Sequence, residues 1–168
     1  MKKTVQTRIN GFTIRFAEEN DARIVLDMVR ELAAYEKLVD NLEATEELFS
    51  ESLFQRGVAE ALIGEYEGKP VGYAIFFHNF SSFTGRIGLY IEDIYVKPEM
   101  RGKGFGRAML TYIAQLAIER KCGRLEWSCL DWNKPSIAFY EKMDAKRLED
   151  WTMYKLSGDA LQRMARKS

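Results

Sequence analysis

The middle of the chain constrains the fold most, because a strand, a glycine-rich loop and a helix follow one another there directly. IGLYIEDIYVKP, at residues 87–98, is the longest β-rich run, and Pro98 ends it because proline cannot continue a central ladder. The loop RGKGFG follows at residues 101–106, and apolar residues at helical spacing then predict a long helix over residues 105–121. RLEWSCL, at residues 124–130, is typical of another strand. A strand, loop, helix and strand in this order predict a parallel strand pair.

The rest of the chain shows strand and helix patterns in alternation. By period-2 or helical spacing we expect strands at residues 12–17, 59–67, 71–80 and 147–156, and helices at residues 21–37, 45–55, 134–143 and 159–166. Gly68 and Pro70 supply turn chemistry between two of these strands, which predicts an antiparallel hairpin. The sequence therefore predicts an α/β or α+β fold: a mixed central sheet with antiparallel N-terminal strands and a parallel pair near the loop, flanked by helices.

Length and charge limit the classes of protein to which the chain can belong. At 168 residues it can bury a core as one domain, which we expect to span residues 1–168. Basic and acidic residues balance at 25 each, so charge gives no reason to expect nucleic acid or an anionic membrane as a partner. The polar N-terminus and the lack of any apolar stretch near ~20 residues predict a cytoplasmic protein. Cys122 and Cys129 fit no zinc pattern, and we expect no metal.

The glycine loop is suited to an anion. Glycines let backbone N–H groups turn toward one point, and the following helix adds the positive end of its dipole, so phosphate is the natural guest. A magnesium-bound triphosphate is disfavoured, because a Walker A loop ends in Gly-Lys-Ser/Thr whereas Arg107 follows the last glycine here. A dinucleotide fingerprint is disfavoured as well, because Gly102, Gly104 and Gly106 run GxGxG and not GxGxxG.

Arg101, Gly104 and Gly106 instead match a loop of the form Arg/Gln-x-x-Gly-x-Gly/Ala between a fourth strand and a long helix. In this feature the sequence resembles the GNAT superfamily of N-acetyltransferases, whose loop holds the diphosphate of acetyl-coenzyme A. YIEDIYVKPEMRGKGFG, DWNKPSIAFYEKMDA and RELAAYE further resemble its spermidine/spermine and thialysine branch, with correspondence from about Ile14 to the C-terminal helix. The resemblance implies acetyl-CoA-dependent acetylation of a small primary amine by direct attack, in a homodimer.

The resemblance also implies which residues bind acetyl-CoA. The strand before the loop would offer backbone hydrogen bonds to the pantetheine arm, the loop would hold the diphosphate, and the helix after Trp132 would add side-chain contacts. The implied set is Ile94, Tyr95 and Val96 on the strand, Arg101, Gly102, Lys103, Gly104, Phe105, Gly106 and Arg107 in the loop, and Asn133, Ser136, Tyr140 and Lys142 on the later helix. Asn133 is equally suited to a plain N-cap, and most exposed helix lysines like Lys142 bind nothing.

Acetylation needs proton transfer, because an alkylamine with a lysine-like pKa of ~10.4 is almost fully protonated at pH 7. Glu92 precedes the strand residues implied to bind the cofactor, and it is the candidate base, acting directly or through a water. Residue type alone favours a solvated carboxylate, and the resemblance favours the base. Tyr140 is the candidate acid for the leaving thiolate. By itself it is more typical of core packing, and the matching WNxPSxxFY motif favours the acid.

The amine-binding residues follow from the same resemblance. Tyr35 and Glu36 match an AxYE element, and further carboxylates would favour a polycation if they face one cleft. These carboxylates are Glu92, Asp93, Glu126 and Asp131. Glu126 stands where the polyamine enzymes carry a histidine, and Phe83 at best represents their tryptophan. Spermidine, thialysine, another diamine and a small amino-acid-like amine therefore stay open. Transfer to a protein lysine or N-terminus, and a binding module without turnover, are the alternatives.

Overall fold

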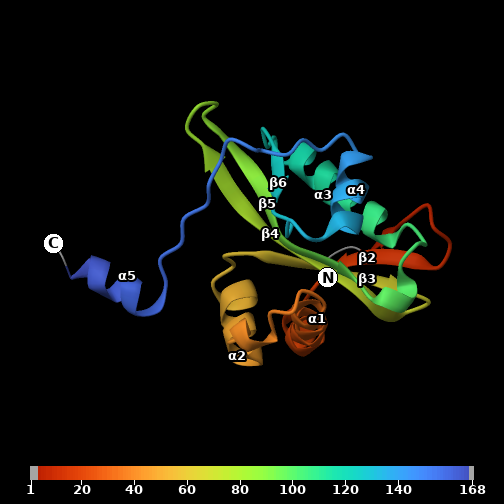
Figure 1. The fold of residues 1–168 in the computed structure, drawn as a ribbon. Coiled ribbons are helices and arrows are strands. Elements are labelled where there is room, and N and C mark those ends of the chain that lie inside the picture. The colour runs from red at the N-terminus through yellow and green to blue at the C-terminus, as the bar shows by residue number, and fades with distance from the viewer. Residues whose placement is uncertain (1–3, 167–168) are drawn as a thin grey trace. The chain divides into compact units, whose positions relative to one another are not determined.

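The computed structural model describes residues 4–166, and the chain divides into two compact units, one that ends at Ser128 and one that begins at Cys129. The first unit contains the whole sheet, whose six strands follow chain order (Figure 1). The strands are β1 (Val5–Gln6), β2 (Phe12–Phe16), β3 (Glu60–Tyr66), β4 (Lys69–Ser81), β5 (Arg86–Val96) and β6 (Leu125–Trp127). Neighbours pair antiparallel except β5 and β6, which are parallel. The predicted mixed sheet is confirmed.

The short strand β1 was not expected from the sequence. It pairs with β2, and Val5 lies opposite Ile14. The strand before the glycine loop is therefore the fifth in the sheet and not the fourth. The hairpin predicted around Gly68 and Pro70 joins β3 to β4, and Pro70 itself pairs with Glu65.

The helices of the first unit are α1 (Ala22–Tyr35), α2 (Glu46–Phe49) and α3 (Phe105–Glu119), with single 3-10 turns at Glu19–Asp21, Val39–Asn41 and Pro98–Met100. The Thr45 hydroxyl accepts a hydrogen bond from the Leu48 N–H at 3.3 Å and caps α2. The helix expected over residues 45–55 continues after α2 as a π-helical segment, Ser50–Gln55, and so differs from one regular helix.

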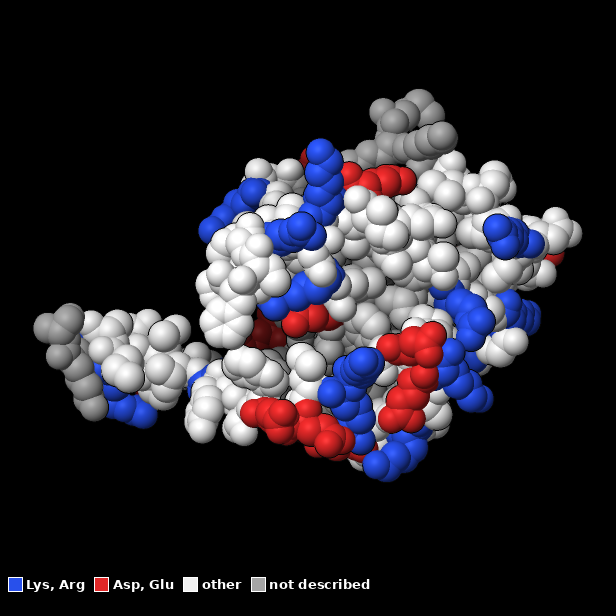
Figure 2. All heavy atoms as spheres, turned by 90° about the horizontal axis from the view of Figure 1, so that it is seen from above, with Lys and Arg blue, Asp and Glu red and all other residues white. Residues whose placement is uncertain are grey.

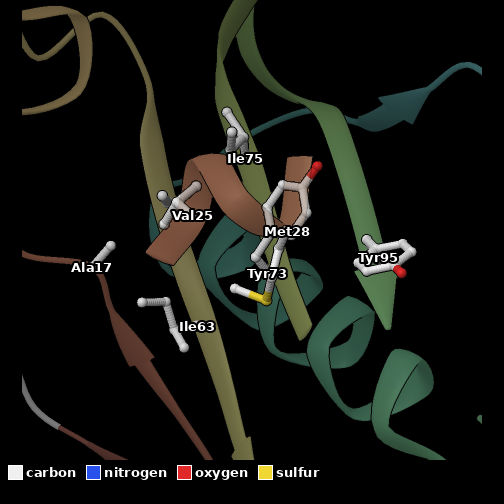
Figure 3. Close-up of a cluster of buried hydrophobic side chains, with 8 residues drawn as sticks. Ala17, Val25, Met28, Ile63, Tyr73, Ile75 and Tyr95 are labelled. Atoms are coloured by element: carbon white, nitrogen blue, oxygen red, sulfur yellow. The ribbon is translucent and has the colours of Figure 1, made fainter. Parts of the chain in front are cut away.

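Helices cover both faces of the sheet in the first unit (Figure 1). Helix α1 packs on β4, and its Val25 and Met28 lie in one buried cluster with Tyr73 and other side chains of the sheet (Figure 3). Helix α3 packs on β4 and β5 from the opposite face. There the Phe105 ring stacks on Phe12 with centroids 4.2 Å apart. The sheet is thus buried between two apolar layers, which fixes the strand that leads into the loop.

One irregularity interrupts the pairing of β4 with β5. Ile75 lies opposite Asp93, and the next residue of β4, Phe76, lies opposite Ile91. Glu92 is therefore an extra residue, and the strand carries a β-bulge there. Bulges occur often beside active sites, where they redirect side chains.

The second unit contains two helices, α4 (Lys134–Glu141) and α5 (Gly158–Ala165). The strand predicted at residues 147–156 is wrong: no residue of this segment lies in a strand. Alternation reports only a local preference, whereas a strand also needs the backbone groups of a partner, and the segment forms no ladder with the described residues. Its side chains are exposed, and Tyr154 is 93% exposed.

Candidate functional site

The glycine loop has the backbone geometry of an anion site. Gly102 and Gly104 adopt left-handed φ angles of 78° and 85°, which side chains with a Cβ rarely adopt. A Cβ at Gly104 would also lie 3.3 Å from Ile9 Cδ1. Gly104 is the N-cap of α3 and no side chain caps that end, so the first N–H groups of a 15-residue helix are left to an external acceptor. The loop therefore has the backbone geometry of a site for a phosphate-like anion.

The backbone edge of β5 before this loop is open in the first unit. The pairing of β5 with β6 extends only from Leu89 to Ile91. Ile94, Tyr95 and Val96 pair with β4 on one side, and no strand among residues 4–128 lies along their other edge. Amide groups of an extended ligand arm can bond to backbone groups at such an edge. Residues 94–96 therefore present backbone groups along this edge, and their role in binding pantetheine stays a prediction.

The side chains of the loop have different environments. Phe105 is buried in the core, so only its backbone can face a ligand. The Lys103 ammonium lies 5.3 Å from the centre of the Tyr66 ring, and Arg107 is exposed. Gly106 lies in the first turn of α3. The loop can therefore bind an anion mainly through its backbone, with Lys103 and Arg107 adding positive charge at its surface.

Arg101 connects the start of the loop to helix α1. Its Nε donates to the Val96 carbonyl at 3.0 Å. Its guanidinium lies over the Tyr35 ring at 4.5 Å from the centroid, and 5.7 Å from the centroid of Tyr95. The structure thus brings a predicted cofactor residue and a predicted amine residue, Tyr35, into direct contact.

Glu36 and two carboxylates of β5 form an acidic region at the bulge. Glu36 is the C-cap of α1, and burial raises its pKa. Glu92 is exposed at the bulge, whereas Asp93 is half-buried and its Oδ2 accepts a hydrogen bond from the Tyr73 hydroxyl at 3.2 Å. Burial, with the charges of Glu92 and Glu36, raises the pKa of Asp93 to about 6 although the Tyr73 hydrogen bond opposes the shift. Three carboxyl groups thus lie near one another at the bulge, and Asp93 gains a proton at a higher pH than an ordinary aspartate does.

Glu126, also predicted to bind the amine, is engaged by neighbours on the sheet. On β6 it forms an ion pair with Arg124 Nε at 2.8 Å and accepts a hydrogen bond from Asn79 Nδ2 at 2.8 Å. Arg124 offsets much of its charge, so Glu126 contributes less to cation attraction than the carboxylates at the bulge.

The remaining predicted residues lie in the second unit, on or beside α4. Asn133 is the N-cap, 6% exposed, and its side-chain oxygen accepts from the Ser136 N–H at 3.3 Å. The N-cap interpretation of Asn133 is thereby confirmed. Tyr140 lies in the last turn with its ring 5.3 Å from that of Phe139, and Lys142 is the exposed C-cap. Asp131 is exposed, with an Arg147 nitrogen at 3.7 Å.

Sequence reasoning did not single out Tyr73 or Glu31. Tyr73 is fully buried on β4 and bonds to Asp93. Glu31 on α1 accepts from the Tyr95 hydroxyl at 3.1 Å and pairs with Lys97 at 3.0 Å, which fastens α1 to the end of β5. A polar group in an apolar strand is a signal for a buried hydrogen bond, and Tyr73 in VGYAIFF carries that signal.

Among residues 4–166, no group of three or more His, Cys, Asp or Glu side chains could hold a metal ion. None of the helices in the described part of the chain has the length and apolar character needed to cross a membrane. On the face seen in Figure 2, basic and acidic side chains are interspersed.

Comparison with known proteins agrees with the geometry. Residues 26–145 match the model of the acetyltransferase (GNAT) family. A thialysine N-epsilon-acetyltransferase from Sus scrofa is 39% identical over 166 residues, which cover 92% of this chain and 97% of that protein. The spermidine/spermine N(1)-acetyltransferase-like protein 1 of Homo sapiens is 32% identical over 95% of this chain and 24% of its own length.

A solved structure shares the fold. An integron cassette protein from the mobile metagenome of V. cholerae superposes with a TM-score of 0.80 at 23% identity, over 94% of this chain and 99% of that one. The family match, the relatives and the sheet with its glycine loop lead to one assignment. The chain belongs to the acetyltransferase (GNAT) family.

Proposed function

We propose that the chain is an N-acetyltransferase that moves the acetyl group of acetyl-CoA onto a primary amine of a small molecule, with thialysine or a diamine such as spermidine as the substrate class. The observation that carries the proposal is the uncapped N-terminus of α3 behind two left-handed glycines, directly after an open strand edge. Family membership and the thialysine acetyltransferase relative support it.

Acetyl-CoA supplies an activated acetyl thioester. The N–H groups of the loop and of the first turn of α3 bind its diphosphate, with Arg101, Lys103 and Arg107 as flanking charges. The backbone of residues 94–96 orients the pantetheine arm. Asn133, Ser136 and Lys142 are proposed to add contacts from α4. Tyr140 is proposed to give its proton to the leaving thiolate, whose thiol has a pKa near ~8.5.

The amine is proposed to bind beside Tyr35, Glu36 and the carboxylates at the bulge of β5, with Glu126 as a further contact. A carboxylate at the bulge takes the proton that keeps the amine unreactive, and the sequence resemblance names Glu92 for this step. Negative charge on Glu36, Glu92 and Asp93 favours a substrate that carries one or more ammonium groups. The same resemblance leads us to propose a homodimer, and we propose a cytoplasmic location, as expected from the sequence.

Thiol release from acetyl-CoA tests the function. Thialysine, lysine, spermidine, spermine, putrescine and an aminoglycoside are supplied as acceptors, and mass spectrometry identifies the acetylated nitrogen. We expect saturable turnover with at least one acyclic diamine or thialysine, and kinetics that require both substrates to be bound. Tight acetyl-CoA binding without turnover on any acceptor would favour a binding module, and acetylation of peptides alone would favour protein transfer.

Ping-pong kinetics or a trapped acetyl-enzyme would contradict direct attack. Cys122 and Cys129 are the thiols to examine in that case, because a cysteine thiolate is intrinsically very nucleophilic.

A further inference from the structure

We infer that Asp93, held by the buried hydroxyl of Tyr73, is the group that accepts the proton from the amine, and that exposed Glu92 passes this proton on to water. The inference deepens the proposed function and rests on it. It differs from the sequence resemblance, which names Glu92 as the base.

The β-bulge places Asp93 where this role requires. In a regular strand, residues two apart share a face, so Asp93 would lie on the face of Ile91. Ile91 pairs with Phe76, whose ring contacts Arg120 just beyond α3, and is buried on the α3 side. The extra residue Glu92 shifts the alternation, and Asp93 pairs with Ile75 on the face that carries α1. Asp93 therefore faces the side of the sheet on which α1 ends with Tyr35 and Glu36.

Tyr73 orients the Asp93 carboxylate. Tyr73 is 0% exposed and lies two residues from Ile75 on β4, on the same face as Asp93. Its hydroxyl donates to Asp93 Oδ2. Within the described residues this is the one hydrogen bond to the Asp93 side chain, so Oδ1 is left for an incoming N–H donor. A carboxylate with one oxygen fixed and the other still able to accept a proton can act as a general base.

The surroundings of Asp93 raise its affinity for a proton, as a base for an amine requires. Glu36 faces it from the end of α1, Glu92 precedes it on β5, and the Tyr95 hydroxyl on the same face is engaged by Glu31. Among residues 4–166, no Lys or Arg forms an ion pair with Asp93. Burial, and after it the charges of Glu92 and Glu36, raises the pKa of Asp93 to about 6 against the opposing effect of the Tyr73 hydrogen bond. The pKa difference from an alkylammonium of pKa ~10.4 narrows by about two units, from ~6.6 to ~4.4, so proton transfer to Asp93 is about a hundredfold less unfavourable than to an ordinary carboxylate.

The proton balance of the step is simple. One N–H bond of the ammonium breaks, its electron pair stays on nitrogen as the attacking lone pair, and the proton bonds to Asp93 Oδ1. Asp93 becomes a neutral carboxylic acid. Water then removes this proton through the exposed carboxylate of Glu92, and Asp93 is again an anion before the next amine binds. No oxidant, metal or covalent enzyme intermediate takes part in this step.

The pH dependence of turnover on a diamine, at saturating acetyl-CoA, tests the inference in four variants. Asp93→Asn should lower kcat/KM by about a hundredfold or more. It should also remove the acid limb of the pH–rate profile, that is, the fall in kcat/KM below about pH 6. Glu92→Gln should keep that limb and lower the rate by less than about tenfold. Tyr73→Phe removes a hydrogen bond to the ionised carboxylate, so the acid limb should move to higher pH. Tyr112→Phe, a hydroxyl removed from α3, is the matched control and should change neither rate nor limb.

The outcomes separate the two carboxylates. If Glu92→Gln removes the limb while Asp93→Asn keeps it, Glu92 is the base and the inference fails. A Tyr73→Phe profile identical to that of the wild type would also contradict it, because a purely structural tyrosine leaves the limb in place. If Asp93→Asn does not fold, the Glu92 and Tyr73 variants decide.

A measurement without turnover distinguishes failure of this inference from failure of the proposed function. In protein labelled with ¹³C at the aspartate carboxyl, the Asp93 signal is the one lost in Asp93→Asn. We expect it to titrate near pH 6 and to shift to lower pH when 1,3-diaminopropane is added. Titration at an ordinary aspartate value, or no response to the diamine, would overturn the role of Asp93 whether or not a turnover substrate is found.

Discussion

Replacing Asp93 by asparagine should stabilise the fold at pH 8 and leave its stability unchanged near pH 4. Asp93 is half-buried, has one hydrogen bond from Tyr73 and lies near Glu36 and Glu92. An ionised carboxylate at such a position costs free energy that a neutral amide does not. The asparagine carbonyl can still accept the Tyr73 hydrogen bond, so the substitution removes charge with little loss of contact.

The size and sign of the effect follow from the pKa. Asp93 has a pKa of about 6 in the fold against an ordinary value of 3.8. As the pH rises from about 4 to about 6, the unfolded chain loses the proton first, so the folded state binds more protons and wild-type stability falls through this window. The shift is about two units, and at 1.36 kcal/mol per unit the loss is about 2 to 3 kcal/mol. Asp93→Asn removes the loss above pH 6.

Urea unfolding followed by tryptophan fluorescence measures the effect at pH 4 and pH 8. The free energy of unfolding of the variant should exceed that of the wild type by about 2 to 3 kcal/mol at pH 8 and by little at pH 4. Glu92→Gln is the matched control, because its exposed side chain should change stability by less than about 0.5 kcal/mol. An equal difference at both pH values, or a variant that is less stable at pH 8, would refute a raised pKa at Asp93.

Three further predictions concern the cofactor loop and the acid. Gly104→Ala puts a Cβ on a left-handed residue beside Ile9, at a cost of about 1 to 2 kcal/mol. It should weaken acetyl-CoA binding about tenfold, as measured by calorimetry. The control Gly57→Ala, also at a left-handed residue but in open space, should leave acetyl-CoA binding unchanged. Arg101→Gln loses the contact with Tyr35 and should raise the Kd for acetyl-CoA two- to fivefold. An unchanged Kd would show that this contact has no role in acetyl-CoA binding. Tyr140→Phe should lower kcat about a hundredfold with acetyl-CoA affinity unchanged, and an unaltered kcat would remove Tyr140 from acid catalysis.

Local sequence signals predicted most of the first unit. Alternation over residues 59–67 and 71–80, with Gly68 and Pro70 between them, is a hairpin signal that needs no distant contact. The parallel pairing of β5 with β6 followed from the order of strand, loop, helix and strand. These features were predictable because each depends on residues that are near one another in the chain.

Two of the features that sequence reasoning missed depend on distant partners. Nothing in YIEDIYV marks Glu92 as an extra residue, because the bulge appears only when β5 is aligned with β4. The run RLEDWTMYKL, at residues 147–156, alternates like a strand but has no ladder partner among the described residues. The face on which Asp93 lies is for the same reason a property of the folded sheet and not of the strand's own sequence.

The bulge also relates the amine side of the sheet to the proposed cofactor path. The diphosphate is proposed to bind at the N-terminus of α3, after Val96, so an arm that runs back along the edge of residues 94–96 must approach the bulge with its thioester end. The strand rises only about 7 Å from residue 94 to residue 96, so a short part of the pantetheine arm is enough to pass along this edge. β6 stops pairing at Ile91, just before Glu92. The open edge therefore begins where the alternation shifts, and the amine that we propose Asp93 to bind on the α1 face would lie next to the place where the strands part. One inserted residue thus serves both needs, since the same irregularity redirects the carboxylate and marks the end of the β5–β6 ladder.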